Sequence, residues 1–331
     1  MSRYLKLIRI QNLLFIAVIQ FLIRQFVIAP LLETSGVIVH GSFFHIGLLI
    51  AASVLITAGG YIINDYFDIK IDTLNKPDKV IVGKSIDKRT TMLLYQFCTF
   101  SGIAIGLFLS WYVRSPMLTF IFLVVPGLLW FYSASYKRQL IIGNAVIAFL
   151  SALSVLIVLF TELEHLKTQA SVVLDATVYS SLFAWVGGFT LFSFLLTWIR
   201  EIIKDMEDVY GDREMECRTL PIVWGIKTTK IISVSLIGIT IVILLIINFV
   251  YIDFEGTLTL RYILFGLILP FACVIYLLIK AKQPDEYHRI SNLIKFIMLI
   301  GLLYAPIFYF LLAKKMGLIL FIQSFYCLLN Y

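Results

Sequence analysis

Hydrophobic residues along this chain form long runs separated by short polar segments. A helix needs about 20 mostly apolar residues to cross the hydrocarbon core of a bilayer. Nine runs meet this requirement, near residues 10–30, 44–63, 91–113, 117–133, 139–160, 177–199, 230–252, 261–279 and 291–313. The pattern therefore predicts an all-α, polytopic membrane protein, with residues 1–331 forming a single integral-membrane domain.

The first apolar run and the C-terminal tail are the two apolar segments nearest the ends of the chain. The first apolar run is too long for a signal peptide and is followed by no small-residue cleavage site, so we expect it to be retained. The tail MGLILFIQSFYCLLNY, which begins at Met316, is apolar but short for a tenth span. Two alternatives remain for this tail: it extends the ninth helix or it lies in the membrane interface.

Basic residues between the runs predict the orientation. Of the 27 Lys and Arg residues, 20 fall in the segments on the N-terminal side of the membrane and five on the other side. Because cytoplasmic loops carry an excess of Lys and Arg, we expect the N-terminus to face the cytoplasm. The protein would then lie in the plasma membrane or inner membrane, and nine spans would place the C-terminus outside.

The composition agrees with this class. The chain is 60% hydrophobic and only 14% charged, whereas soluble domains are about one quarter charged. The net charge of +7 is explained by cytoplasmic loops, so we infer no nucleic-acid partner and no obligatory protein partner. The four cysteines and four histidines are dispersed, which indicates neither a disulfide framework nor a zinc site.

Acidic residues are concentrated in two of the predicted cytoplasmic segments. Segments 64–89 and 200–218 hold 12 of the 20 Asp and Glu residues. NDYFDIKID (64–72) and KDMEDVYGD (204–212) share the spacing D-x-x-D-x-x-x-D. On a continuous helix this spacing places all three carboxylates on one face. The motifs end the second and sixth spans, which suggests two four-helix halves plus a ninth helix.

Solvated helix ends would be the simplest explanation of these carboxylates. However, like charges on one helical stripe repel each other, and the same spacing occurs twice. A bound cation would remove this repulsion. Oxygen ligands without nearby Cys or His favour Mg²⁺, which typically binds through one or two carboxylates together with substrate phosphates. The candidate metal ligands are Asp65, Asp68, Asp72, Asp205, Asp208 and Asp212.

Basic residues near the motifs could stabilise the charge on a leaving diphosphate. The segment YSASYKR places Lys137 and Arg138 in the loop between the two motifs. Lys79, Lys204 and Arg218 flank the motifs themselves. The competing explanation for each of these residues is ordinary cytoplasmic loop charge.

Taken together, NDYFDIKIDTLNKPDK, REIIKDMEDVYGD and YSASYKR with Gly143-Asn144 resemble UbiA-type intramembrane prenyltransferases. Asn64, Asp65, Asp68 and Asp72 match the first signature of that family, and Asp208 and Asp212 match the second. The family often has a tyrosine four residues before the loop lysine, whereas Tyr132 is five residues before Lys137.

The resemblance implies a UbiA-like fold and a Mg²⁺-dependent transfer of an isoprenyl group from a prenyl diphosphate. It implies that Asn64 joins the metal site and binds diphosphate, and that Asp68, Asp72, Asp208, Asp212 and Lys137 are catalytic. The sequence is most similar to the digeranylgeranylglyceryl-phosphate synthase branch, whose acceptor is geranylgeranylglyceryl phosphate in ether-lipid synthesis.

Two alternatives to this function remain. One is prenylation of an aromatic acceptor, of the hydroxybenzoate or dihydroxynaphthoate type, in quinone biosynthesis. The other is a secondary transporter, whose coupling carboxylates would lie near the middle of the bilayer rather than at helix ends.

Overall fold

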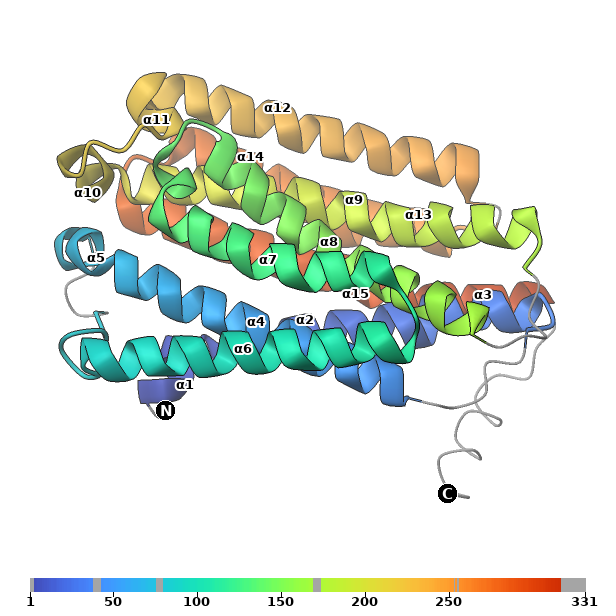
Figure 1. Ribbon diagram of the computed structural model, residues 1–331. Coiled ribbons are helices and arrows are strands. Elements are labelled where there is room, and N and C mark those ends of the chain that lie inside the picture. The colour runs from blue at the N-terminus through green and yellow to red at the C-terminus, as the bar shows by residue number, and fades with distance from the viewer. Residues whose placement is uncertain are drawn as a thin grey trace.

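Long helices running side by side make up most of the molecule (Figure 1). The computed structural model describes residues 3–37, 43–75, 80–168, 174–252, 254 and 256–316. By length and composition, nine helical segments among these residues could cross a membrane, as the sequence predicts. They are Ile10–Thr34, Phe44–Phe67, Lys88–Tyr112, Pro116–Ala134, Ile142–Lys167, Ala176–Glu207, Gly225–Tyr251, Leu258–Lys280 and Pro284–Met316.

Several of these segments are assembled from consecutive elements. The first comprises α2 (Ile10–Ile23), the π turn η1 (Arg24–Ile28) and α3 (Ala29–Thr34). The eighth comprises α13 (Leu258–Arg261), the π turn η5 (Tyr262–Ile268) and α14 (Leu269–Lys280). Pro30 and Pro270 follow these π turns. A proline inside a helix removes one hydrogen bond, and a local π turn re-pairs the freed backbone groups.

The remaining spans are α4 (Phe44–Phe67), α6 (Lys88–Tyr112), α7 (Pro116–Ala134), α8 (Ile142–Lys167), α9 (Ala176–Glu207), α12 (Gly225–Ile246) with η4 (Ile247–Tyr251), and α15 (Pro284–Met316). Their starts follow ordinary capping chemistry. The Asp87 carboxylate accepts a hydrogen bond from the Thr90 amide at 2.9 Å, and Ser115 caps α7 ahead of Pro116.

Short helices gather at one end of the bundle. They are α1 (Arg3–Leu7), α5 (Ile69–Asn75), the 3₁₀ turn η3 (Tyr136–Arg138), α10 (Val209–Glu214) and α11 (Leu220–Val223). Figure 1 places α1, α5, α10 and α11 at the same end of the bundle. Both aspartate motifs therefore lie at the end that carries the N-terminal helix.

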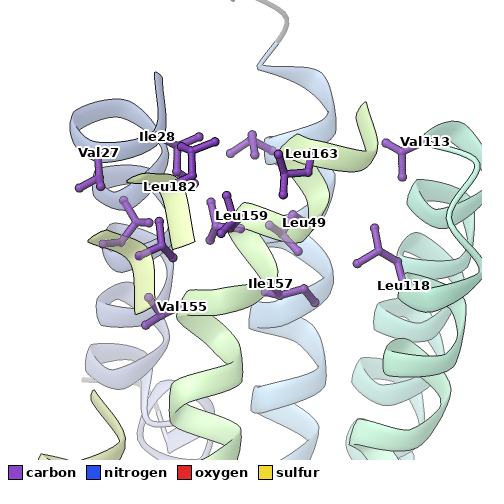
Figure 2. Close-up of a cluster of buried hydrophobic side chains, with 14 of the residues drawn as sticks. Val27, Ile28, Leu49, Val113, Leu118, Val155, Ile157, Leu159, Leu163 and Leu182 are labelled. Atoms are coloured by element: carbon purple, nitrogen blue, oxygen red, sulfur yellow. The ribbon is translucent and has the colours of Figure 1, made fainter. Parts of the chain in front are cut away.

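The buried hydrophobic residues form distinct clusters toward the two ends of the bundle. The largest cluster joins η1, α4, α8 and neighbouring helices at the end away from α5 and α10, and includes Val27, Leu49 and Leu159 (Figure 2). A second cluster joins α9, α12, α14 and α15. Many large apolar side chains also face outward from the spans, for example Phe97 at 68% exposure and Phe249 at 71%. Such an apolar surface suits contact with lipid.

A charged cluster is buried at the end of the bundle opposite the aspartate motifs. Glu162 of α8 accepts a hydrogen bond from His45 of α4 at 2.9 Å, and Arg24 of η1 lies 3.6 Å from the same carboxylate oxygen. His45 in turn stacks on His165 with ring centroids 4.0 Å apart. The side chains of Arg24 and Glu162 are 4% and 1% exposed, so each charge depends on the other for compensation.

The structure corrects one prediction about the motifs. The carboxylates do not lie on continuous helices, because α4 ends at Phe67 and α9 ends at Glu207, with the middle aspartate of each motif immediately after the helix. Continuous helices would have aligned three like charges, and an aspartate side chain favours helix ends over interiors. The C-terminal tail from residue 317 lies outside the described residues.

Candidate active site

The two aspartate motifs have the same backbone form. Asp68 has φ −88° and ψ 1°, and Asp208 has φ −97° and ψ 6°. The amide of Asp72 donates to the Asp68 carbonyl at 2.8 Å, and the amide of Asp212 donates to the Asp208 carbonyl at 3.1 Å. In each half, the middle aspartate is thus a bend between a long membrane helix and a short one.

Asn75 joins the two motifs across the bundle. Its side-chain oxygen accepts a hydrogen bond from the Gly211 amide at 2.7 Å, and its side-chain nitrogen donates to the Asp208 carbonyl at 3.3 Å. A Cβ atom at Gly211 would lie 2.5 Å from the Asn75 side chain, so this close approach of α10 to α5 requires glycine. Residues 136 positions apart are thereby fixed next to each other.

Lys137 enters the site from the loop between α7 and α8. Its ammonium group pairs with the Asp68 carboxylate, and both side chains are nearly buried. The start of α8 supports this loop, because a Cβ atom at Gly143 would lie 2.7 Å from the Lys137 Cα. Ile141, just before α8, has φ 66°, a conformation that a β-branched residue rarely adopts. The backbone is strained where it positions the lysine.

Amide and guanidinium groups orient other carboxylates of the site. The Asn64 side chain donates to Asp68 at 2.8 Å, and the Asn144 side chain donates to Asp205 at 2.7 Å. The first aspartate of the first motif, Asp65, instead accepts a hydrogen bond from Arg9 at 2.7 Å. Each half therefore uses an asparagine to fix an aspartate at the end of its long helix.

The third aspartate of each motif is electrostatically unfavourable in its charged form. Burial raises the pKa of Asp72 to about 6, helped by the carboxylates of Asp68 and Asp65. Burial raises the pKa of Asp212 to about 7, helped by Asp208 and by Asp68 of the opposite motif. The two motifs thus act on each other, and a cation between them would lower the pKa of both groups.

The oxygen donors of this site suit Mg²⁺ better than a softer metal. Among the described residues, no three carboxylate, His or Cys side chains are grouped closely enough to hold a metal ion by themselves. This arrangement agrees with a hard cation that takes part of its ligand shell from substrate phosphates and water. The crowded carboxylates that raise the pKa of Asp72 and Asp212 supply the negative charge such an ion needs.

An apolar pocket lies in the interior of the bundle. It lies between α2, α8, α9 and α15, and its lining includes Ser151, Val155, Ser193 and Met298. Ser193 precedes Asp205 by 12 residues on α9, which corresponds to about 18 Å at 1.5 Å per residue. A long hydrocarbon chain bound at the aspartates could therefore reach this pocket.

Comparison with known proteins identifies this arrangement. The model of the UbiA prenyltransferase family matches residues 27–300. The chain belongs to the UbiA prenyltransferase family. It is therefore an integral, multi-pass membrane protein of a prenyltransferase family, and the transporter alternative is set aside.

Several curated relatives are named digeranylgeranylglyceryl phosphate synthase. The digeranylgeranylglyceryl phosphate synthase of Methanoregula boonei is 34% identical over 62% of this chain and 65% of its own length. That of Methanothermobacter thermautotrophicus is 31% identical over 58% of this chain, which spans 61% of the relative. That of Sulfolobus acidocaldarius is 31% identical over 72% of this chain and 75% of its own length.

Solved structures share the UbiA fold. A structure described as giving insights into the biosynthesis of digeranylgeranylglyceryl phosphate synthase in membranes has a TM-score of 0.61 and 25% identity, covering 94% of this chain and 98% of its own. A UbiA homolog from Archaeoglobus fulgidus bound to GPP and Mg²⁺ has a TM-score of 0.56 and 14% identity, covering 92% and 99%. At that identity the second likeness shows the fold alone.

The structure brings most of the predicted UbiA site residues together. Asn64, Asp65, Asp68, Asp72, Lys137, Asp205, Asp208 and Asp212 lie in the two joined motifs and the loop beside them. Lys204 lies 3.4 Å from Glu201, one turn before Asp208. The Arg138 Nε atom is buried and has no hydrogen-bond partner in the part of the chain that the structure describes. Arg218 is exposed, although its amide donates to the Arg138 carbonyl at 2.8 Å, and Lys79 lies outside the described residues.

Sequence reasoning missed several UbiA site residues. Arg9 and Asn75 reach the motifs from positions that no local spacing marks. Tyr132, for which the sequence predicted no role, lies in the last turn of α7, next to the loop that carries Lys137.

Proposed function

We propose that this UbiA protein transfers a geranylgeranyl group from geranylgeranyl diphosphate to the free hydroxyl of geranylgeranylglyceryl phosphate. The observation that carries this proposal is the joining of two aspartate motifs by Asn75, with Lys137 paired to Asp68 between them. The names of the relatives support this acceptor. The product is a diether lipid precursor.

The residues divide into two roles in this proposal. Asp68, Asp72, Asp208 and Asp212, with Asn64, Asp65 and Asp205 beside them, would hold Mg²⁺ together with the diphosphate oxygens. When bound, the metal supplies positive charge that stabilises the departing diphosphate. Lys137 faces the same oxygens and adds a direct hydrogen-bond donor. Lys204, Arg138 and Arg218 would supply further positive charge around the leaving group, and the sequence assigns the same role to Lys79.

The transfer breaks the bond between C1 of the donor and its diphosphate oxygen, and the bonding electrons leave with the diphosphate. The acceptor hydroxyl oxygen then forms a bond to C1, and its proton is released at the aqueous end of the site. An allylic cation at C1 must be kept from water until it meets the acceptor. Burial of Lys137 and Asp68, with side chains 12% and 13% exposed, supports such a site.

The prenyl tail would occupy the apolar pocket between α2, α8, α9 and α15. Ser193 of its lining lies about 18 Å from Asp205 along α9, a distance that a long prenyl chain can span. This direction places the diphosphate at the end of the bundle and the hydrocarbon inside it. The excess of Lys and Arg on the N-terminal side supports a cytoplasmic orientation of the aspartate motifs.

A transfer assay on the purified protein tests the proposal. Radiolabelled geranylgeranyl diphosphate and Mg²⁺ are supplied with geranylgeranylglyceryl phosphate or with an aromatic acid such as hydroxybenzoate, and EDTA is added to a parallel sample. We expect a digeranylgeranyl product only with the glyceryl phosphate, lost with EDTA and in Asp68→Asn and Asp208→Asn. Product with the aromatic acid alone would move the protein to quinone synthesis. Full activity of either variant would refute the role given to the two motifs.

A further inference from the structure

Four cationic side chains gather on the membrane side of the aspartate motifs. Arg9 lies between α1 and α2, Arg200 and Lys204 lie on α9, and Lys295 lies on α15. Lys295 lies one turn before Met298, which lines the apolar pocket together with Ser193 of α9, and Arg200 follows Ser193 by seven residues. Arg200 precedes Asp208 by eight residues, so the cluster begins about 12 Å along α9 from the bend.

Among the described residues, these four cations have few ion-pair partners. Glu201 lies 2.6 Å from Arg200 and 3.4 Å from Lys204, and Asp65 lies 2.7 Å from Arg9. Arg200 and Lys204 therefore share one carboxylate. Within the described residues no carboxylate forms an ion pair with Lys295, and the Arg200 Nε atom is buried without a partner.

Lys295 and Arg9 both occupy positions that are energetically unfavourable for such residues. Lys295 is an ionisable residue within an apolar span, and such residues typically mark ligand sites. Arg9 has φ 51° and ψ 55°, the left-handed region that a residue with a side chain rarely occupies. This bend directs the guanidinium group toward α4, where it lies 4.9 Å from the Tyr61 ring centroid.

We propose that Arg9, Arg200, Lys204 and Lys295 bind the phosphate monoester of the acceptor lipid. This inference rests on the proposed function. A phosphate monoester carries a charge of about −1.5 to −2 near neutral pH and three strong acceptor oxygens, so Arg and Lys side chains are suited to bind it. In the acceptor the reacting hydroxyl is on the carbon next to the phosphate-bearing carbon, so its phosphate must lie beside the donor diphosphate and apart from it. Lys204, one residue before Asp205, connects the two sites.

The test is Lys295→Gln, assayed in detergent with a saturating concentration of one substrate while the other is varied. We expect the KM for geranylgeranylglyceryl phosphate to rise about 10- to 100-fold, the loss expected for one charged hydrogen bond. The KM for geranylgeranyl diphosphate should stay within about twofold, because its diphosphate lies at the aspartates. Lys295→Arg should restore the acceptor KM, and Lys227→Gln, an exposed lysine at the same end of the bundle, should behave as wild type.

Geranylgeranylglycerol, which lacks the phosphate, serves as a second acceptor. It distinguishes the loss of a phosphate contact from a general loss of structure in the variant. Wild type should prefer geranylgeranylglyceryl phosphate over geranylgeranylglycerol, and Lys295→Gln should lose most of this preference. Equilibrium binding of labelled geranylgeranylglyceryl phosphate without donor or Mg²⁺ should weaken in parallel.

An unchanged acceptor KM, or an equal rise in both KM values, would overturn the phosphate site while leaving the proposed function intact. A wild-type protein that transfers to neither acceptor would remove the proposed function, and the binding measurement alone would then decide the phosphate site.

Discussion

Asn75 provides the sharpest test of how the site is assembled, because it is the residue that hydrogen-bonds across the two aspartate motifs. Asn75→Ala leaves the Gly211 amide without its acceptor at 2.7 Å and removes the weaker bond to the Asp208 carbonyl at 3.3 Å. Leaving a buried donor unsatisfied costs about 1–3 kcal/mol. If all of this energy holds the second motif in its active position, kcat/KM falls by about 5- to 150-fold.

Two measurements are needed for the Asn75→Ala prediction. Transfer kinetics at saturating acceptor give kcat/KM for the donor, and hydrogen exchange followed by mass spectrometry reports the protection of the peptide containing Gly211. Thr73→Ala is the matched control, because among the described residues the Thr73 side chain donates to the Ile69 carbonyl within α5 and to no group of the second motif. If Asn75→Ala and Thr73→Ala give the same kinetics and the same protection, the cross-link between the motifs does not position the site.

Three further predictions concern the pocket, the carboxylates and the buried charges. Val155→Trp should fill the apolar pocket and lower kcat/KM for geranylgeranyl diphosphate by about tenfold more than for geranyl diphosphate; equal losses would place the tail elsewhere. The pKa values of Asp72 and Asp212 are raised from 3.8 to about 6 and about 7, so their protonated forms favour folding, and the metal-free protein should lose stability as pH rises from about 4 to 7. Thermal unfolding without Mg²⁺ should show this decline, and a midpoint independent of pH would contradict it. Arg24→Met should cost about 3–5 kcal/mol by leaving Glu162 buried without its cation, and unfolding of the double variant with Glu162→Gln should recover part of that loss.

Features that depend on a local sequence pattern could be predicted from the sequence alone. Nine apolar runs predicted the nine spans, because a membrane helix needs a continuous apolar stretch regardless of its neighbours. The repeated aspartate spacing located both motifs, and the loop sequence located Lys137. These residues could be found because each is close in sequence to the helix end that positions it.

Features that depend on distant contacts could not be predicted in this way. The partner of Asn75 is 136 residues away, and Arg9 reaches Asp65 across 56 residues. The bends at Asp68 and Asp208 arise from crowding of like charges, which competes with a helical pattern that continues on both sides. Glu162 was placed beyond the fifth span, because its buried partners Arg24 and His45 come from other helices.

The bends at Asp68 and Asp208 also have an electrostatic consequence for substrate entry. The long helices α4 and α9 both end at the site, and the aligned peptide dipoles of a helix place about half a negative charge at its C-terminal end. Two such ends add to the aspartate charges, so a bare diphosphate would be repelled. On the proposed function, donor and Mg²⁺ therefore increase each other's affinity, and by reciprocity the gain must be the same whichever of the two binds first.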